Sequence, residues 1–144
     1  MGTQQQILIV ENEGLIADDL QSRLERLGYR VPAIAFSGSQ ALQVARTTRF
    51  DLVLMDIGLK GEMDGIEAAE ILQHEIQIPI VFVTAHADAD TVRRALAAEP
   101  FGFVLKPIVI EALRATIEIA LRRSDVERRL SGSPQLVAAG TRLP

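Results

Sequence analysis

Five short apolar runs recur along the chain, each rich in β-branched or large aliphatic residues and mostly free of polar positions. An unbroken apolar run differs from the alternating pattern of a half-exposed strand and is typical of a strand buried on both faces. The runs therefore predict five strands, at residues 7–10, 31–36, 52–55, 78–83 and 101–105.

Between these runs, apolar residues recur three or four positions apart, as they do on one face of an α-helix. The first four helices are indicated by Leu15, Ile16, Leu20, Leu24 and Leu27; Ala41, Leu42 and Ala45; Ile66, Ala69, Ile71 and Leu72; and Val92, Ala95 and Leu96. A fifth helix is predicted to begin after Pro107 and to run toward Leu130. Gly28 is placed to end the first helix, and Asp64 with Glu67 resembles an acidic capping box that starts the third.

Strands and helices thus alternate with short connections, which implies right-handed crossovers and a parallel sheet. Helices then cover both faces, so the predicted fold class is α/β, a three-layer α/β/α sandwich around a five-stranded parallel sheet. In open sheets of this kind, ligands bind beyond the carboxyl ends of the strands, where the strand order reverses.

Four of the runs lead into polar residues suited to phosphoryl or metal chemistry. Glu11 and Asn12 follow the first run, Asp56 the third, Thr84 the fourth and Lys106 the fifth. A carboxylate next to so apolar a segment is costly to desolvate, so Asp56 is expected at the end of its strand. The oxygens of Glu11, Asn12 and Asp56 are ligands of the type that Mg²⁺ prefers.

These residue types also suggest one reaction. A carboxylate held beside a phosphoryl group can attack phosphorus and form an acyl phosphate. Lys106 would then neutralise phosphoryl oxygens and Thr84 would donate a hydrogen bond to one of them. Asp56 could instead be a structural strand-end residue, and Asn12 is also a favourable N-cap for the first helix, a role compatible with metal contact.

Composition limits the remaining possibilities. The chain has 144 residues, 48% of them apolar and 24% charged, which fits one globular domain. It has no cysteine, which excludes disulfides and thiolate sites and fits a cytoplasmic location, and no apolar stretch long enough to span a membrane. A net charge of −4 argues against direct nucleic-acid binding, and the arginines late in the last helix are expected to form a solvated face: Arg122, Arg123, Arg128 and Arg129.

Five segments together resemble the receiver domain of bacterial two-component response regulators. They are residues 7–13 (ILIVENE), 53–56 (VLMD), 63–67 (MDGIE), 83–85 (VTA) and 102–107 (GFVLKP). The resemblance implies a flavodoxin-like strand order 2-1-3-4-5, a receiver domain over residues 5–123, and a helical extension with a flexible tail over 124–144. It also implies a signalling switch rather than an enzyme with a separate substrate.

The resemblance assigns roles to the polar residues. Asp56 is implied as the phosphoacceptor, served by a histidine kinase or phosphotransfer protein, with Thr84 and Lys106 contacting the phosphoryl group. Glu11, Asn12, Asp56 and the Gly58 carbonyl are implied as the Mg²⁺ site. Phe103 falls at the aromatic switch position that accompanies Thr84, and Lys106–Pro107 is similar to the cis peptide of the family.

Two departures from the family pattern stand near the phosphoacceptor. Asn12 replaces the usual aspartate, which removes one negative charge and is expected to weaken Mg²⁺ binding. Residues 58–62 lack the usual proline and form a segment one residue longer than the commonest version. His86, two residues after Thr84, is expected near the same edge but not as a base or a metal ligand.

The sequence leaves rival functions open. A nucleotide or flavin binder would need a glycine- or hydroxyl-rich turn where Glu11, Asn12 and Glu13 stand, and an aspartyl phosphatase would carry its nucleophile after the first strand. A third rival is a receiver-like docking module that works without phosphorylation, weakened in metal binding by Asn12.

Partners are implied by the same resemblance. The surface of helix 4, strand 5 and helix 5 is expected to change on phosphorylation and to contact a downstream effector or a second copy of the chain. Ile119, Val126 and Leu130 form a weak apolar stripe on the last helix that suits association. No membrane partner is expected.

Overall fold

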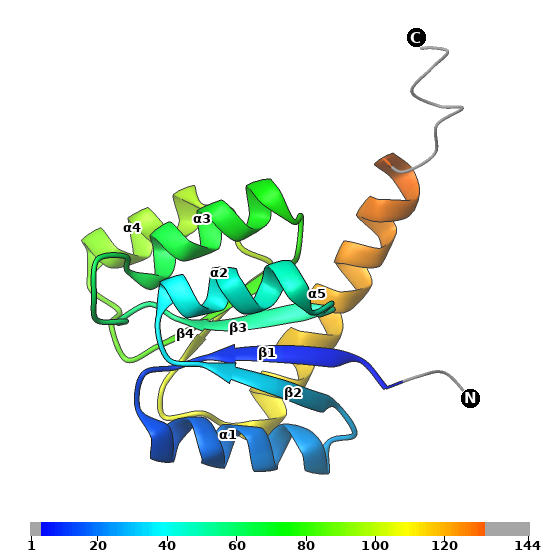
Figure 1. Cartoon of the computed structure of the whole chain (residues 1–144), viewed down its shortest axis with the longest axis horizontal. Coiled ribbons are helices and arrows are strands. Elements are labelled where there is room, and N and C mark those ends of the chain that lie inside the picture. Colours follow the sequence, from blue (N-terminus) through cyan, green and yellow to red (C-terminus); the bar gives the residue numbers. More distant parts are fainter. Residues whose placement is uncertain (1–3, 132–144) are drawn as a thin grey trace, which may run out of the picture.

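The computed structural model describes residues 4–131, in which strands and helices alternate around one sheet (Figure 1). The strands are β1 (Gln6–Val10), β2 (Arg30–Ala35), β3 (Leu52–Asp56), β4 (Ile80–Thr84) and β5 (Gly102–Leu105). The helices are α1 (Gly14–Arg26), α2 (Gly38–Thr47), α3 (Gly65–Glu75), α4 (Ala89–Ala97) and α5 (Ile110–Ser131).

All five strands are parallel and lie in the order β2-β1-β3-β4-β5. β1 pairs with β2 on one side and with β3 on the other, so the strand order reverses at β1. The predicted α/β class, the parallel sheet and the flavodoxin-like order are therefore confirmed. The reversal also places the expected ligand position beyond the carboxyl ends of β1 and β3.

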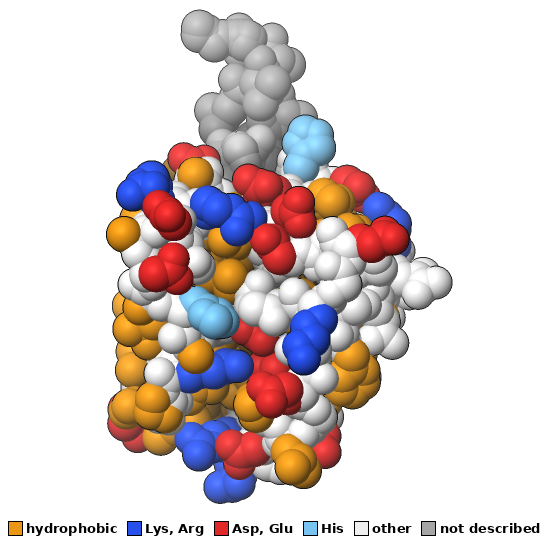
Figure 2. All heavy atoms as spheres, turned by 90° about the vertical axis from the view of Figure 1, so that its left-hand side faces the viewer, with side chains coloured by type: hydrophobic (Ala, Val, Ile, Leu, Met, Phe, Trp, Pro, Cys, Tyr) orange, Lys and Arg blue, Asp and Glu red, His pale blue; other side chains and the backbone are white. Residues whose placement is uncertain are grey.

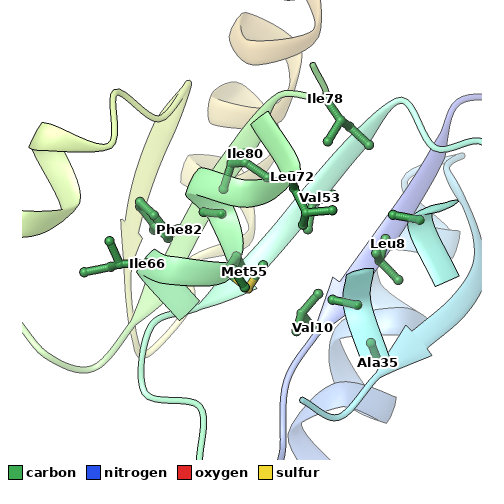
Figure 3. Packing of buried hydrophobic residues seen from close by; sticks show 14 of the residues in the cluster. Leu8, Val10, Ala35, Val53, Met55, Ile66, Leu72, Ile78, Ile80 and Phe82 are labelled. Carbon is green, nitrogen blue, oxygen red and sulfur yellow. The ribbon is translucent and has the colours of Figure 1, made fainter. Parts of the chain in front are cut away.

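Two apolar cores lie on opposite faces of the sheet. Alternate residues of each strand supply them: Leu8 and Val10 pack toward α2, α3 and α4, while Ile7 and Ile9 pack toward α1 and α5. Figure 3 shows the first core, where side chains of the sheet meet those of α3. Every residue of β3 and β4 is buried, which explains why both appear in the sequence as unbroken apolar runs.

The predicted strand bounds were wrong by one or two residues. β4 begins at Ile80 rather than at residue 78, since Pro79 has no N–H to donate; its carbonyl instead accepts from the Val53 N–H at 3.0 Å. β3 and β4 each continue one residue beyond the apolar run, because Asp56 and Thr84 still pair with the neighbouring strands. Both polar residues are therefore the last residues of their strands.

The predicted helix signals are confirmed at two positions. Gly28 has a φ of 101° just after α1, a conformation that favours glycine. Asp64 caps α3: its carboxylate accepts the Glu67 N–H at 2.9 Å, and the Glu67 carboxylate accepts the Asp64 N–H at 2.9 Å. Arg94 of α4 also donates to Asp64, at 2.8 Å.

Replacing this cap residue is expected to cost stability. Asp64→Ala removes the capping bond to Glu67, so the free energy of unfolding should fall by about 1–2 kcal/mol in urea titrations. Glu62→Ala, at a neighbouring exposed position, is the control and should change it by less than about 0.5 kcal/mol. Equal losses in the two variants would contradict the capping role.

Helix α5 runs without a break through Ser131, as far as the sequence pattern predicted. Its carboxy-terminal end projects past the amino-terminal ends of the strands (Figure 1). The proposed division between residues 123 and 124 falls inside this helix, and the predicted tail over 132–144 lies outside the described residues. Within residues 4–131, no helix is both long and apolar enough to cross a membrane.

Candidate functional site

Polar side chains from four strand ends meet at one edge of the sheet. Glu11, Asp56 and Thr84 are buried there, with 3%, 7% and 0% of their surface exposed, and Lys106 lies beside them. Figure 2 views this edge, where carboxylate, Lys or Arg, and His side chains meet near the centre. The sheet topology thus brings together the residues that the sequence placed at separate strand ends.

Asp56 is fixed by its own loop and by the opposite strand end. Its Oδ1 accepts the Gly58 N–H at 3.1 Å, and its Oδ2 lies 3.8 Å from Nζ of Lys106. Because Asp56 pairs with Val83 of β4 in the sheet, its carboxylate lies at the edge formed by the carboxyl ends of the strands. The expectation of a strand-end carboxylate is confirmed.

Lys106 links two acidic residues. Its Nζ donates to Glu11 Oε1 at 2.8 Å, while Glu11 Oε2 accepts the Glu13 N–H at 3.2 Å. The Lys106 backbone N–H donates to the Thr84 carbonyl at 2.9 Å, so pairing of β4 with β5 fixes where the ammonium group stands. One cation therefore serves both Glu11 and Asp56.

The single positive charge of Lys106 does not neutralise both buried carboxylates, Glu11 and Asp56. Burial and then the charge of Glu11 raise the pKa of Asp56 from 3.8 to about 6, against the opposing effects of Lys106 and the Gly58 N–H. At neutral pH Asp56 is still mainly ionised, at a cost in free energy. A further cation close to Asp56 would lower that cost.

The residues at this edge fit a hard divalent cation such as Mg²⁺. Glu11 and Asp56 are carboxylates, Asn12 is half-buried between β1 and α1, and Gly58 follows Asp56 by two residues. Within residues 4–131 no three Asp, Glu or His side chains cluster as a metal site, so an amide or carbonyl oxygen would have to complete the set.

The alternative role of Asn12 as N-cap was wrong. Helix α1 begins at Gly14 with Glu13 as N-cap, and no side chain makes a capping bond there. Asn12 lies one residue too early to accept from the first turn. Its amide is therefore not committed to capping.

Thr84 and Phe103 lie on the same face of the sheet. Thr84 Oγ1 accepts the His86 N–H at 3.0 Å. Phe103 pairs with Phe82 across β4 and β5, and the two rings meet edge to face with centroids 6.5 Å apart. Phe103 is half-buried against the α2–α4 core.

Near Asp56, the tertiary structure adds close contacts at two glycines. A Cβ on Gly58 would lie 3.2 Å from Nε2 of His86, so the imidazole covers Gly58. Gly65 donates its N–H to the Ile57 carbonyl at 3.2 Å, and a Cβ there would overlap the Asp56 carbonyl oxygen. The sequence indicated Gly65 only as part of a capping box. The one sequence signal for this close approach was the presence of a glycine directly after the cap residue Asp64, nine residues after Asp56.

The peptide bond between Lys106 and Pro107 is cis, as the family resemblance implied. It lies directly after β5, where the chain turns toward α5.

Comparisons with known proteins show the family of this chain. The protein-family model described as the response regulator receiver domain matches residues 7–118 of this chain. The transcriptional regulatory protein ZraR of Klebsiella oxytoca is 40% identical over 134 residues, 92% of this chain and 29% of that protein. PdtaR of Mycobacterium tuberculosis, also a transcriptional regulatory protein, is 37% identical over 117 residues, 81% of this chain and 57% of that protein.

A solved structure gives the same result. The signal receiver domain of a modulated diguanylate cyclase from Desulfovibrio desulfuricans G20 superposes with a TM-score of 0.82 at 37% identity, covering 87% of this chain and 99% of that one. The present chain spans little more than half, or less, of the length of the curated relatives it matches. The chain belongs to the response regulator receiver domain family, the signalling switches of bacterial two-component systems.

Proposed function

We propose that Asp56 accepts the phosphoryl group of this receiver domain from a histidine kinase or phosphotransfer protein, with Mg²⁺ as cofactor. The observation that carries the proposal is the position of Asp56: a buried carboxylate at the switch point of the sheet, 3.8 Å from the ammonium group of Lys106. Among the described residues, Asp56 is the one carboxylate that both lies at this position and has a raised pKa, of about 6.

The reaction follows from these groups. A carboxylate oxygen of Asp56 attacks the phosphorus of a phosphohistidine, the P–N bond breaks, and its electron pair stays on the imidazole, which takes a proton from solvent. Lys106 offsets charge on the phosphoryl oxygens, and Thr84 donates its hydroxyl to one of them after releasing the His86 N–H. Mg²⁺, held by Glu11, Asn12, Asp56 and the Gly58 carbonyl, would supply further charge compensation.

The switch is part of the same proposal. Movement of Thr84 toward the phosphoryl group vacates space that Phe103 can enter, because both side chains lie on one face of the sheet. The surface of α4, β5 and α5 would then present a different outline to an effector. The chain takes part in its own phosphorylation and dephosphorylation, but its output is a change of conformation.

Mass measurement tests the proposal. The chain is incubated with Mg²⁺ and acetyl phosphate or phosphoramidate, and its intact mass is recorded over time. One added phosphoryl group is expected. If the mass stays unchanged with both donors, the rival docking module is favoured over the phosphoacceptor. The comparisons do not favour that rival. The acidic turn after β1 disfavours the other rival, the nucleotide or flavin binder, because its carboxylates would repel phosphate in the absence of a metal.

Asn12→Asp is expected to speed the reaction. The substitution restores a third carboxylate, so Mg²⁺ should bind about tenfold or more tightly and labelling at limiting Mg²⁺ should accelerate by a similar factor. Mg²⁺ titration by calorimetry and the labelling rate check both effects. Asp18→Asn, an exposed charge change on α1, is the control and should leave both unchanged. Equal rates in wild type and Asn12→Asp would show that residue 12 does not contact the metal.

The remaining assignments belong to the same proposal. We place the receiver domain at residues 5–123 and treat the end of α5 as an extension, consistent with the family match over 7–118. A cytoplasmic location and the absence of direct nucleic-acid binding stay predictions from composition.

A further inference from the structure

Helix α4 has few apolar contacts with the rest of the domain. Of its nine residues only Ala95 is buried, whereas α3 and α5 bury leucine and isoleucine side chains. The C-cap residue Ala98 is buried as well, and both alanines pack into the core on this face of the sheet. Because apolar stabilisation grows with the area buried, core packing holds α4 only weakly.

Two polar side-chain contacts attach α4 to α3 instead. At the carboxy-terminal end of α4, Gln73 of α3 donates its side-chain N–H to the Ala98 carbonyl at 2.7 Å. Nearer the middle of α4, Arg94 donates to Oδ2 of Asp64 at 2.8 Å. The two helices lie side by side on one face of the sheet (Figure 1). Both contacts reach α3 rather than a strand, so the position of α4 depends on that of α3.

The Asp64 carboxylate binds both helices. Its Oδ1 accepts the Glu67 N–H at 2.9 Å in the first turn of α3, and its Oδ2 accepts from Arg94. Glu67 and Glu70 of α3 add electrostatic attraction to the Arg94 guanidinium. A hydrogen bond between ionised groups is roughly twice as strong as one between neutral groups. The start of α3 is therefore joined directly to α4.

The start of α3 is also joined to the strand that carries Asp56. Gly65, the residue after the cap, donates its N–H to the Ile57 carbonyl at 3.2 Å. A Cβ on Gly65 would overlap the Asp56 carbonyl oxygen, so the two backbones are in contact. The loop between β3 and α3, which contains Gly58, thus leaves Asp56 and returns to its backbone at Gly65. A rearrangement of this loop displaces Asp64, because one peptide bond joins Asp64 to Gly65.

We propose that the Arg94–Asp64 contact couples the surroundings of Asp56 to α4, by a route that runs through α3 and uses neither Thr84 nor Phe103. A ligand at Asp56 that changes the loop between β3 and α3 displaces the cap, and Arg94 carries the displacement to α4. By reciprocity, the position of α4 changes the affinity of the loop for that ligand by the same factor. Arg94 is thus a positioning residue. The inference rests on the proposed function of Asp56 and adds a second connection from it to the surface of α4, β5 and α5.

Hydrogen exchange tests the contact in the full chain without metal or phosphodonor. Arg94→Ala should raise the exchange rates of the amides of residues 92–97 at least about threefold, because α4 loses one of its links to α3. Arg93→Ala is the matched control. It removes the neighbouring arginine, which pairs with Asp90 of α4 itself at 2.8 Å, and should change these rates by less than about 1.5-fold. Equal increases in the two variants would overturn the proposal.

Asp64→Asn separates the link to α4 from the cap of α3. Asparagine is as good an N-cap as aspartate and can still accept the Glu67 N–H, but it lacks the charge that attracts Arg94. Exchange of α4 in Asp64→Asn should rise toward that of Arg94→Ala, and the double variant should not exceed Arg94→Ala by more than about 1.5-fold. Arg94→Lys keeps the charge and should recover part of the protection. Additive effects of the two substitutions would show that the residues act separately and would refute the coupling.

Phosphorylation tests the route itself. Wild type, Arg93→Ala and Arg94→Ala are compared with and without Mg²⁺ and acetyl phosphate, and intact mass reports the labelled fraction. Labelling should change the exchange of residues 92–97 at least about threefold in wild type and Arg93→Ala, and less than half as much in Arg94→Ala. The same comparison with Mg²⁺ alone separates two failures. A constant wild-type mass would refute Asp56 as phosphoacceptor, whereas equal Mg²⁺ responses of all three chains would overturn the route through Arg94.

Discussion

Asp56→Asn should abolish phosphoryl transfer completely and at the same time stabilise the protein. Asparagine nearly matches aspartate in shape and can keep the Gly58 hydrogen bond, but its amide is not a nucleophile. Intact mass after incubation with acetyl phosphate should show no added group, whereas wild type should gain one. A mass gain in Asp56→Asn equal to that of wild type would move the phosphoacceptor elsewhere.

The stability effect follows from the raised pKa of Asp56. Its pKa is about 6 in the folded chain and 3.8 when unperturbed, so the folded chain binds more protons between these values. Wild-type stability without metal should therefore fall as pH rises from about 4 to 6, by up to about 3 kcal/mol. Asp56→Asn lacks this titration, and in EDTA at pH 7.5 it should exceed wild type by about 1–3 kcal/mol in urea unfolding.

Mg²⁺ provides the internal control for this measurement. Binding to the folded wild type should recover stability by mass action, and Asp56→Asn should respond less because one carboxylate is gone. Asp51→Asn, at the opposite edge of the sheet, should leave the response to Mg²⁺ unchanged. A wild-type stability that stays flat between pH 4 and 6 in EDTA would contradict the charge imbalance at Asp56.

Gly65→Ala is expected to be the most destabilising single-methyl change at this site. The added Cβ would overlap the Asp56 carbonyl oxygen and lie 2.8 Å from the Ile57 Cα, so backbone rather than a flexible side chain must move. The N-terminus of α3 would have to leave the β3–α3 loop and lose the Gly65 N–H to Ile57 bond. The free energy of unfolding should fall by about 3 kcal/mol or more.

Gly14→Ala is the matched control for this prediction. It also sits at the first residue of a helix, yet a Cβ there meets nothing within 4 Å. Its effect should lie between neutral and about 1 kcal/mol stabilising, because alanine reduces the freedom of the unfolded chain. Urea titrations of both variants check the contrast. Similar stabilities would mean that the loop at Asp56 yields easily to the methyl group.

The order and type of the elements were predictable because their signals are local. An unbroken apolar run requires a strand covered on both faces, as β3 and β4 are, and helical spacing of leucines marks α1 without reference to any distant residue. The capping box of α3 is local too, since Asp64 and Glu67 are three residues apart. Strand ends were less accurate, because pairing with neighbours carries Asp56 and Thr84 into their strands.

The candidate site was predictable only in part. Strand-end positions gave Glu11, Asp56, Thr84 and Lys106, since parallel strands must end at one edge. The prediction of Asn12 as N-cap was wrong, because α1 begins at Gly14 and its N-cap is Glu13. The first residue of the helix depends on the path of the loop between β1 and α1. Which carboxylate Lys106 prefers was also undecided, and the structure pairs it with Glu11 at 2.8 Å rather than with Asp56 at 3.8 Å.

The sequence by itself determined the alternation of strands and helices, the parallel sheet and the residue types at its carboxyl edge, because hydrophobic period and strand-end position are properties of neighbouring residues. Only the tertiary structure decided the cover of His86 over Gly58, the close approach of Gly65 to Asp56 and the exposure of Ile119, Val126 and Leu130 on α5. The first two depend on how closely the chain approaches itself in three dimensions, and the third on which side of α5 the sheet occupies. No local pattern encodes either.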